Sequence, residues 1–224
     1  MIKEHIKAVN ALNEIKCDVI NLIKENKTEK QIVNYILNEY KRRKLKTKDN
    51  PIVSFGKNTS EMHHSSKNQK IKNGPIMLDI WAKSGDCFAD LTWMFYKGKP
   101  DEKFIYCFNE LVKARNKAII FIKNCLKERY LPTMVEIDSI SRSYLAEKKL
   151  GFAFLHRVGH ALGKKVHADN KKGYYKRLMI NRPYTLEPGI YFENKFGIRL
   201  ENDFWIDGDF KLHTTEIQSR LIII

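Results

Sequence analysis

Apolar residues recur every three or four positions along several parts of the chain, which predicts amphipathic helices. Four segments have this pattern: residues 2–24, a segment from Thr28 into the basic run before Asn50, residues 101–130, and a segment from Thr133 to about Leu150. The second and fourth begin with a threonine followed three residues later by Gln31 or Glu136, which is the spacing of a capping box. Two predicted helices therefore have defined starting points.

Shorter apolar or alternating runs, bounded by Gly, Pro, Asn or Asp, predict strands. The predicted strands are residues 52–55, 76–80, 87–95, 184–193, 196–206 and 221–224. The polar segment 57–74 is predicted to be a loop. Helices early and in the middle, each followed by strands, favour an α+β fold, and no linker divides residues 1–224 into separate domains.

The composition is that of a globular protein, with 43% hydrophobic and 30% charged residues. Its longest apolar runs are far too short to cross a bilayer, and the N-terminus has no apolar signal-peptide core. The four cysteines form no CxxC pair and are expected to be reduced thiols. These features predict a soluble, cytoplasmic protein without a membrane partner.

The formal net charge is +15, and the densest basic run spans residues 41–48. Basic side chains are spread over the whole chain, and no nucleic-acid-binding motif accompanies the run. We interpret the charge as a solvated cationic surface, so specific nucleic-acid binding is not expected. Weak, salt-sensitive binding to polyanions stays open.

Four acidic residues occur where the surrounding sequence is apolar and strand-like: Asp79, Asp90, Glu187 and Glu201. A buried carboxylate is costly unless a cation or hydrogen bonds stabilise it. Any one of these acids alone could be an edge residue or a salt-bridge partner. A pair of divalent ions, with four positive charges, would account for all four together.

Histidines are concentrated in one segment, where His156, His160 and His167 fall within twelve residues. Gly159 and Gly163 flank the middle histidine, and small residues there allow its imidazole and the backbone to approach a metal closely. A His-rich loop without a metal is the alternative interpretation. Together with the four acids, the segment favours a metal centre.

With these motifs the chain resembles the pita-bread metallopeptidases, the group that contains methionine aminopeptidase, aminopeptidase P, prolidase and creatinase. The resemblance covers nearly the whole chain and implies a curved antiparallel sheet covered by helices, in two halves related by a pseudo-twofold axis. The matching motifs are the eleven-residue spacing of Asp79 and Asp90, Gly159-His160-Ala161-Leu162-Gly163, His167 seven residues after His160, Glu187-Pro188-Gly189, and Arg199-Leu200-Glu201.

The resemblance implies two divalent metal ions, with Mn favoured and Co, Zn or Fe as alternatives. Asp79, Asp90 and Glu201 would bind one ion. The other would be bound by Asp90, His160, Glu187 and Glu201, so that Asp90 and Glu201 bridge the pair. A metal-bridging hydroxide would attack the scissile carbonyl, with Glu187 as proton shuttle.

Further site residues follow from the same resemblance. His63 and His167 would hydrogen-bond the substrate and the tetrahedral intermediate, with His64 as the neighbouring alternative to His63. His156 would line the pocket for the proline ring. Arg199 would belong to the substrate site and orient a carboxylate ligand, although an ordinary strand ion pair is the alternative.

Glu187-Pro188-Gly189-Ile190-Tyr191 and the His156 to His160 pair resemble the proline-specific branch, which implies cleavage of the N-terminal bond of peptides with proline in second position. Members of that branch usually carry an N-terminal domain, which we expect this chain to lack. The chain would be a monomer or homodimer. The alternatives are a methionine or general aminopeptidase, and a non-catalytic module that binds peptide, protein or nucleic acid.

Two positions depart from the family pattern. Trp93 stands where an arginine is usual after the second aspartate, and Ala168 stands where an acidic residue often follows the second histidine. No predicted metal ligand is lost, but substrate positioning is expected to differ.

Overall fold

The computed structural model describes all residues 1–224 and contains four α-helices, as predicted. The helices are α1 (Ile2–Lys24), α2 (Glu29–Arg42), α3 (Glu102–Lys127) and α4 (Met134–Glu147). Both predicted capping boxes are present, at the starts of α2 and α4. The strands are β1 (Ile52–Phe55), β2 (Gly74–Ser84), β3 (Cys87–Lys97), β4 (Tyr184–Leu186), β5 (Gly189–Phe192), β6 (Phe196–Arg199), β7 (Asn202–Ile206), β8 (Leu212–Thr214) and β9 (Ile222–Ile223).

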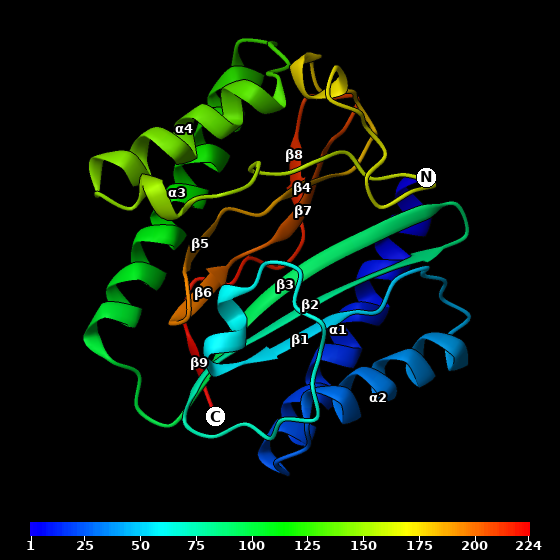
Figure 1. Ribbon diagram of the computed structural model, residues 1–224. Coiled ribbons are helices and arrows are strands. Elements are labelled where there is room, and N and C mark those ends of the chain that lie inside the picture. The colour runs from blue at the N-terminus through cyan, green and yellow to red at the C-terminus, as the bar shows by residue number, and fades with distance from the viewer.

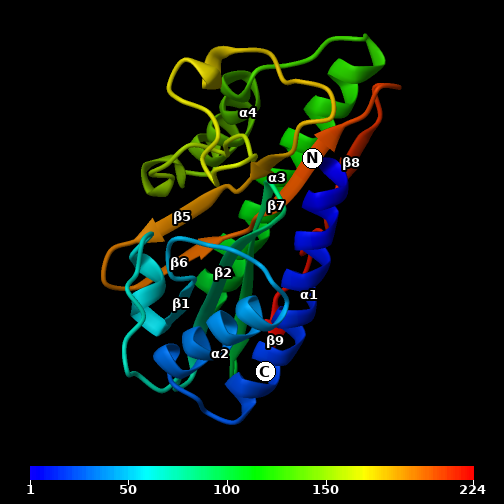
Figure 2. The same ribbon diagram turned by 90° about the vertical axis from the view of Figure 1, so that its right-hand side faces the viewer.

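The N-terminal half consists of a helix pair beside an antiparallel hairpin. β1, β2 and β3 pair in that order, and β9 from the end of the chain adds to β3 in parallel. Helix α1 packs on β2 and β3, and α2 packs on β1 (Figures 1 and 2). Leu12, Ile15 and Val19 of α1 are completely buried in this interface, which accounts for the helical periodicity of the first segment.

The C-terminal half repeats the order of elements of the N-terminal half, a helix pair followed by strands. Helices α3 and α4 pack on each other, and α3 also contacts β5, β6 and β8. Figure 1 shows the α3–α4 pair on the opposite side of the molecule from α1 and α2, with the strands between them. Two separate apolar cores result, one under each helix pair. The α+β prediction is confirmed.

The last third differs from the sequence prediction in one informative way. The predicted strand 184–193 is divided into β4 and β5 by Glu187-Pro188, and the predicted strand 196–206 is divided into β6 and β7 at Leu200-Glu201. Proline has no N–H to donate to a ladder, so pairing cannot continue through Pro188. As a result β4 pairs with β7 and β5 pairs with β6, in two different small sheets.

The other differences are small. β8 was not predicted, and a short 3₁₀ turn over Gly56–Ser60 overlaps the start of the predicted loop 57–74. No helix is both long enough and apolar enough to traverse a lipid bilayer.

Candidate metal centre and active site

Two of the predicted ligands are placed side by side by the β2–β3 register. Asp79 pairs with Thr92, and Trp81 pairs with Asp90, so the two aspartates are diagonal neighbours across the ladder. Residues an even number apart on a strand share a face, so Asp90 and Thr92 point the same way as Asp79. The eleven-residue spacing of the two aspartates therefore follows from an antiparallel hairpin with a two-residue tip.

The two glutamates lie where the C-terminal strands change sheets. Glu187 follows β4 and Glu201 follows β6, so both lie at the strand breaks rather than inside a ladder. Their backbone N–H groups bond outside the two small sheets, Glu187 N to the Val158 carbonyl at 2.7 Å and Glu201 N to the Thr92 carbonyl at 3.3 Å. The second bond attaches Glu201 to β3 close to Asp90.

His160 is brought to the acids by close packing of its segment against β4. Its backbone N–H donates to the Thr185 hydroxyl at 3.0 Å, and the Thr185 N–H donates back to the His160 carbonyl at 2.8 Å. A Cβ atom on Gly159 would lie 2.1 Å from the Thr185 carbonyl oxygen, so only glycine fits there. This contact is the physical reason for the first glycine of the motif.

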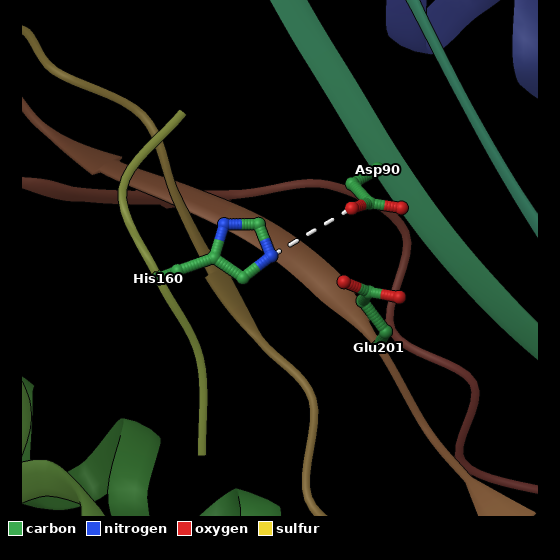
Figure 3. Close-up of side chains that lie close together, drawn as sticks. All are labelled: Asp90, His160 and Glu201. Atoms are coloured by element: carbon green, nitrogen blue, oxygen red, sulfur yellow. Dashed lines mark ion pairs between the residues drawn. The ribbon is translucent and has the colours of Figure 1, made fainter. Parts of the chain in front are cut away.

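The side chains of Asp90, His160 and Glu201 converge (Figure 3), with one ligand atom from each lying within 4.8 Å of the other two. His160 Nε2 also lies 3.3 Å from Glu187 Oε1. Asp90 Oδ1 and Glu201 Oε1 are buried and have no hydrogen-bond partner. Orphaned carboxylate oxygens facing a buried imidazole are a donor set that fits a divalent cation.

The crowding of buried acids in this site shifts their pKa values. Burial and the neighbouring Glu201 charge raise the pKa of Asp90 well above its usual range, and burial together with Glu187 does the same for Glu201. Burial also acts against the Glu187 carboxylate, but hydrogen bonding to His160 outweighs it and lowers the pKa of Glu187 to about 2. Two of these acids thus lack a compensating positive charge among the protein side chains.

Asp79, the remaining predicted ligand, is in the same cavity but forms an ion pair with Arg199. Arg199 Nη1 donates to the Tyr191 hydroxyl at 2.8 Å, and that hydroxyl lies 2.9 Å from His156 Nε2. Arg199 Nε also lies 3.3 Å from the Thr92 hydroxyl. A continuous polar chain therefore joins the residue predicted to contact proline to a predicted metal ligand.

Asp79, His156 and Arg199 line a cavity of about 1220 Å³, which we call the catalytic cavity. All five predicted ligands line it, as do His63, His156, His167 and Arg199. The rings of His160 and His167 are adjacent, with centroids 4.3 Å apart. The structure thus brings every sequence-predicted site residue to one cavity, and their roles stay predictions.

The adjacent histidines 63 and 64 have different surroundings. His64 is buried, with Nε2 lying 2.9 Å from Glu29 Oε2 and Nδ1 lying 2.8 Å from Glu61 Oε2. His63 is exposed at the catalytic cavity. His64 therefore connects the loop to α2, and His63 is the one free to meet a substrate.

Several site residues were given no role by the sequence analysis. The Thr92 hydroxyl donates to Glu201 Oε2 at 2.6 Å, and the Thr185 hydroxyl donates to Glu187 Oε1 at 3.0 Å. Each threonine lies two residues from a predicted ligand in an alternating strand, which is a signal that could have found it. Asp203 is completely buried and accepts a hydrogen bond from the Asp90 backbone N–H at 3.1 Å. Tyr191 is the fourth such residue.

Of the two family departures, Trp93 is explained by its position, and nothing in the structure explains the side chain at Ala168. Trp93 is three residues from Asp90 and therefore on the opposite face of β3, where it is buried in the core beneath α1 with Lys16 Nζ 5.0 Å above its ring. It does not line the catalytic cavity. Ala168 donates its N–H to the Ala161 carbonyl at 2.9 Å, which closes the loop between His160 and His167.

The fold and the donor set define a metallohydrolase class, and comparison with known proteins assigns the family. The chain belongs to metallopeptidase family M24, whose model matches residues 3–207. A peptidase of Staphylococcus epidermidis described as uncharacterized is 29% identical over 208 residues, which are 90% of this chain and 57% of that protein. The chain thus spans little more than half the length of this curated relative.

Solved structures share the fold. A prolidase from Thermococcus sibiricus superposes with a TM-score of 0.82 at 27% identity, covering 100% of this chain and 60% of that one. An X-Pro aminopeptidase from Thermotoga maritima gives a TM-score of 0.86 at 23% identity, covering 100% of this chain and 63% of that one. The pita-bread fold expected from the sequence is confirmed.

Proposed function

We propose that this chain is the catalytic domain of a metal-dependent peptidase that hydrolyses the bond between the N-terminal residue and a following proline. The observation that carries the proposal is the convergence of Asp90, His160 and Glu201 around orphaned carboxylate oxygens, beside the His156–Tyr191–Arg199–Asp79 chain. The names of the prolidase and X-Pro aminopeptidase that share the fold support the same substrate class.

Asp90, His160, Glu187, Glu201 and Asp79 would hold two divalent ions, with Mn favoured. Bound there, the ions would supply an activated water as nucleophile and polarise the scissile carbonyl. One oxygen of Glu201 accepts a hydrogen bond from Thr92, and one oxygen of Asp90 lies 3.7 Å from His160 Nε2. The other oxygen of each carboxylate has no partner, which suits a bridging ligand. Asp79 would keep one oxygen on Arg199 and offer the other.

Glu187 is the side chain suited to move the proton. It is ionised in the free protein and lies beside the donor set, so we assign to it the transfer of the proton from the attacking water to the departing amine. The Thr185 hydroxyl, at 3.0 Å, orients its carboxylate. His63 and His167 would donate hydrogen bonds to the substrate carbonyl as it becomes tetrahedral.

His156 would pack against the proline ring. Its Nε2 is held by the Tyr191 hydroxyl and its ring contacts Phe154 edge to face, with centroids 5.5 Å apart. A ring fixed between two aromatic residues offers an apolar surface in one orientation. Burial lowers the pKa of His156, so the neutral imidazole that suits such a contact is favoured.

The test measures cleavage of two peptides, Ala-Pro-Gly and Met-Ala-Gly. Each is incubated with protein stripped of metal by a chelator, and with the same protein after Mn has been restored. Cleavage of Ala-Pro-Gly that disappears with the chelator and returns with Mn supports the proposal. Preferential cleavage of Met-Ala-Gly would assign a methionine or general aminopeptidase instead. No metal-dependent cleavage of any peptide, with Mn shown to bind, would refute the enzymatic function.

A further inference from the structure

A second cavity of about 1040 Å³ adjoins the catalytic cavity, and we call it the lysine groove. It lies between the end of α2, the segment that follows it, and the tip of the β2–β3 hairpin. Trp81, Val166, His167 and Lys48 line both cavities, so the two adjoin at these residues. His156 and Arg199 line the catalytic cavity only. The groove thus opens beside His167, away from the predicted proline contact.

The groove is strongly cationic. Six lysines line it, with Asp49 as the only acidic residue in its lining: Lys41, Lys46, Lys48, Lys83, Lys164 and Lys165. Among them only Lys164 forms an ion pair, a 3.4 Å contact with Asp86 at the hairpin tip. The basic run noted in the sequence therefore supplies one side of this groove, with Lys41, Lys46 and Lys48 exposed to solvent.

Two of these lysines are held opposite each other by the backbone. Lys46 N donates to the Lys83 carbonyl at 3.0 Å, and Lys83 N donates to the Lys46 carbonyl at 2.8 Å, which forms an isolated antiparallel bridge. Like charges directly opposite in such a pair repel each other. A carboxylate bound between these two side chains would relieve that repulsion.

The rest of the lining suits a peptide rather than a free ion. Leu37, Leu45, Phe88 and Val166 provide apolar surface. Tyr40 also lines the groove through its ring, while its hydroxyl is fully buried and is not accessible to a ligand. A carboxylate on a short aliphatic chain matches this combination of apolar wall and cations.

We propose that the lysine groove binds a carboxylate carried by the substrate residue that precedes proline, so that Glu-Pro and Asp-Pro peptides are preferred. This inference rests on the proposed function, because it places proline at His156 and the scissile carbonyl near His167. The preceding side chain then reaches the groove where Trp81 and His167 border it. Lys48, which lines both cavities, is the first cation on that path.

The test measures kcat/KM for Glu-Pro-Gly, Gln-Pro-Gly and Gly-Pro-Glu with the Mn-loaded protein. Two screened ammonium–carboxylate contacts give an expected preference of about fivefold for Glu-Pro-Gly over Gln-Pro-Gly. The preference is expected to shrink as NaCl is raised to about 1 M, where the screening length is only about 3 Å. Equal rates for Glu-Pro-Gly and Gln-Pro-Gly, or a preference for Gly-Pro-Glu, would overturn the proposal.

A double variant tests whether the lysines of the groove cause the preference for Glu-Pro-Gly. Lys46→Gln with Lys83→Gln is expected to bring the ratio of kcat/KM for Glu-Pro-Gly to that for Gln-Pro-Gly close to one. The matched control, Lys123→Gln with Lys127→Gln on the exposed side of α3, should retain the preference. A preference that survives in the Lys46/Lys83 variant contradicts the assignment. If that variant unfolds, Lys41→Gln with Lys165→Gln replaces it.

Measurements of peptide binding test the groove proposal independently of the proposed function. If no peptide is cleaved, the proposed function fails, and fluorescence anisotropy of labelled Glu-Pro and Gln-Pro peptides on the same protein still decides the groove. Tighter binding of the Glu-Pro peptide that requires Lys46 and Lys83 supports it. A single-stranded oligonucleotide that outcompetes this peptide through the same lysines would assign nucleic acid instead and overturn the proposal.

Discussion

Arg199 forms an ion pair with Asp79, and both side chains are buried in the catalytic cavity. The guanidinium therefore offsets the charge of one predicted ligand before any metal arrives, and it holds that carboxylate toward the site. Through Tyr191 it also positions His156. One arginine thus connects the proposed metal site to the proposed proline site.

Arg199→Gln is expected to destabilise the metal-free protein by about 3–5 kcal/mol, because it leaves the Asp79 carboxylate buried without a partner. Mn should then raise the melting temperature of the variant more than that of the unmodified protein, since the ion replaces the lost positive charge. Differential scanning fluorimetry with and without Mn measures both effects. Equal Mn-induced shifts in the two proteins would contradict a link between Arg199 and the metal site.

Asp90→Asn is expected to abolish binding of both ions, because Asp90 is the proposed bridge and its Oδ1 has no other partner. Isothermal titration calorimetry with Mn and elemental analysis of the dialysed protein report the stoichiometry. Asp209→Asn, in an exposed turn, is the control and should bind as before. Retention of one ion by the Asp90 variant would show that the residue does not bridge.

The neighbouring histidines 63 and 64 are expected to respond oppositely to alanine. His64→Ala removes a buried partner of Glu29 and should cost about 1–3 kcal/mol of unfolding free energy. His63→Ala should leave the unfolding free energy nearly unchanged and lower kcat for Ala-Pro-Gly. Urea denaturation and steady-state kinetics on both variants test the assignment, and a lower kcat with full stability in the His64 variant would reverse it.

The contact between His64 and Glu29 predicts a pH dependence of stability. Burial acts against the His64 imidazolium, but hydrogen bonds to Glu29 and Glu61 outweigh it and raise the pKa of His64 above 6.5. Burial likewise acts against the Glu29 carboxylate, and its hydrogen bonds, led by the one to His64, lower its pKa below 4.5.

The His64 contribution to stability is therefore complete below pH 6.5 and is lost as the pH rises through the folded-state pKa. The Glu29 contribution is complete above pH 4.5 and is lost as the pH falls through its folded-state pKa. Stabilisation by the pair should consequently be greatest between pH 4.5 and 6.5. Unfolding free energies at several pH values, for the unmodified protein and His64→Gln, measure it. A variant that shows the same pH profile would refute the coupling.

Trp93→Arg, which restores the residue usual in the family, is expected to destabilise this protein rather than activate it. Trp93 is 3% exposed in the core beneath α1, and an unpaired guanidinium there should cost more than about 3 kcal/mol. Urea denaturation measures the loss, with Trp205→Arg as a partly exposed control. Higher Ala-Pro-Gly hydrolysis with unchanged stability would place this side chain at the site instead.

The local sequence by itself determined the four helices, because helical periodicity and the Thr28 and Thr133 capping boxes are properties of neighbouring residues. It also determined the β2–β3 hairpin, and with it the adjacency of Asp79 and Asp90, since the strand alternation and the short turn set the register. The family resemblance then pointed to the remaining ligands. Each of these inferences depends on residues close together in the chain or on a short motif.

The tertiary structure alone decided how distant segments meet. It placed the breaks between strands at Glu187 and Glu201. The strands on the two sides of Pro188 belong to different sheets, because β4 pairs with β7 and β5 pairs with β6. It also buried His64 while leaving His63 at the cavity, and it set Lys46 opposite Lys83. Hydrogen bonds and charge contacts between segments far apart in sequence carry no local periodicity, so only the folded chain reveals them.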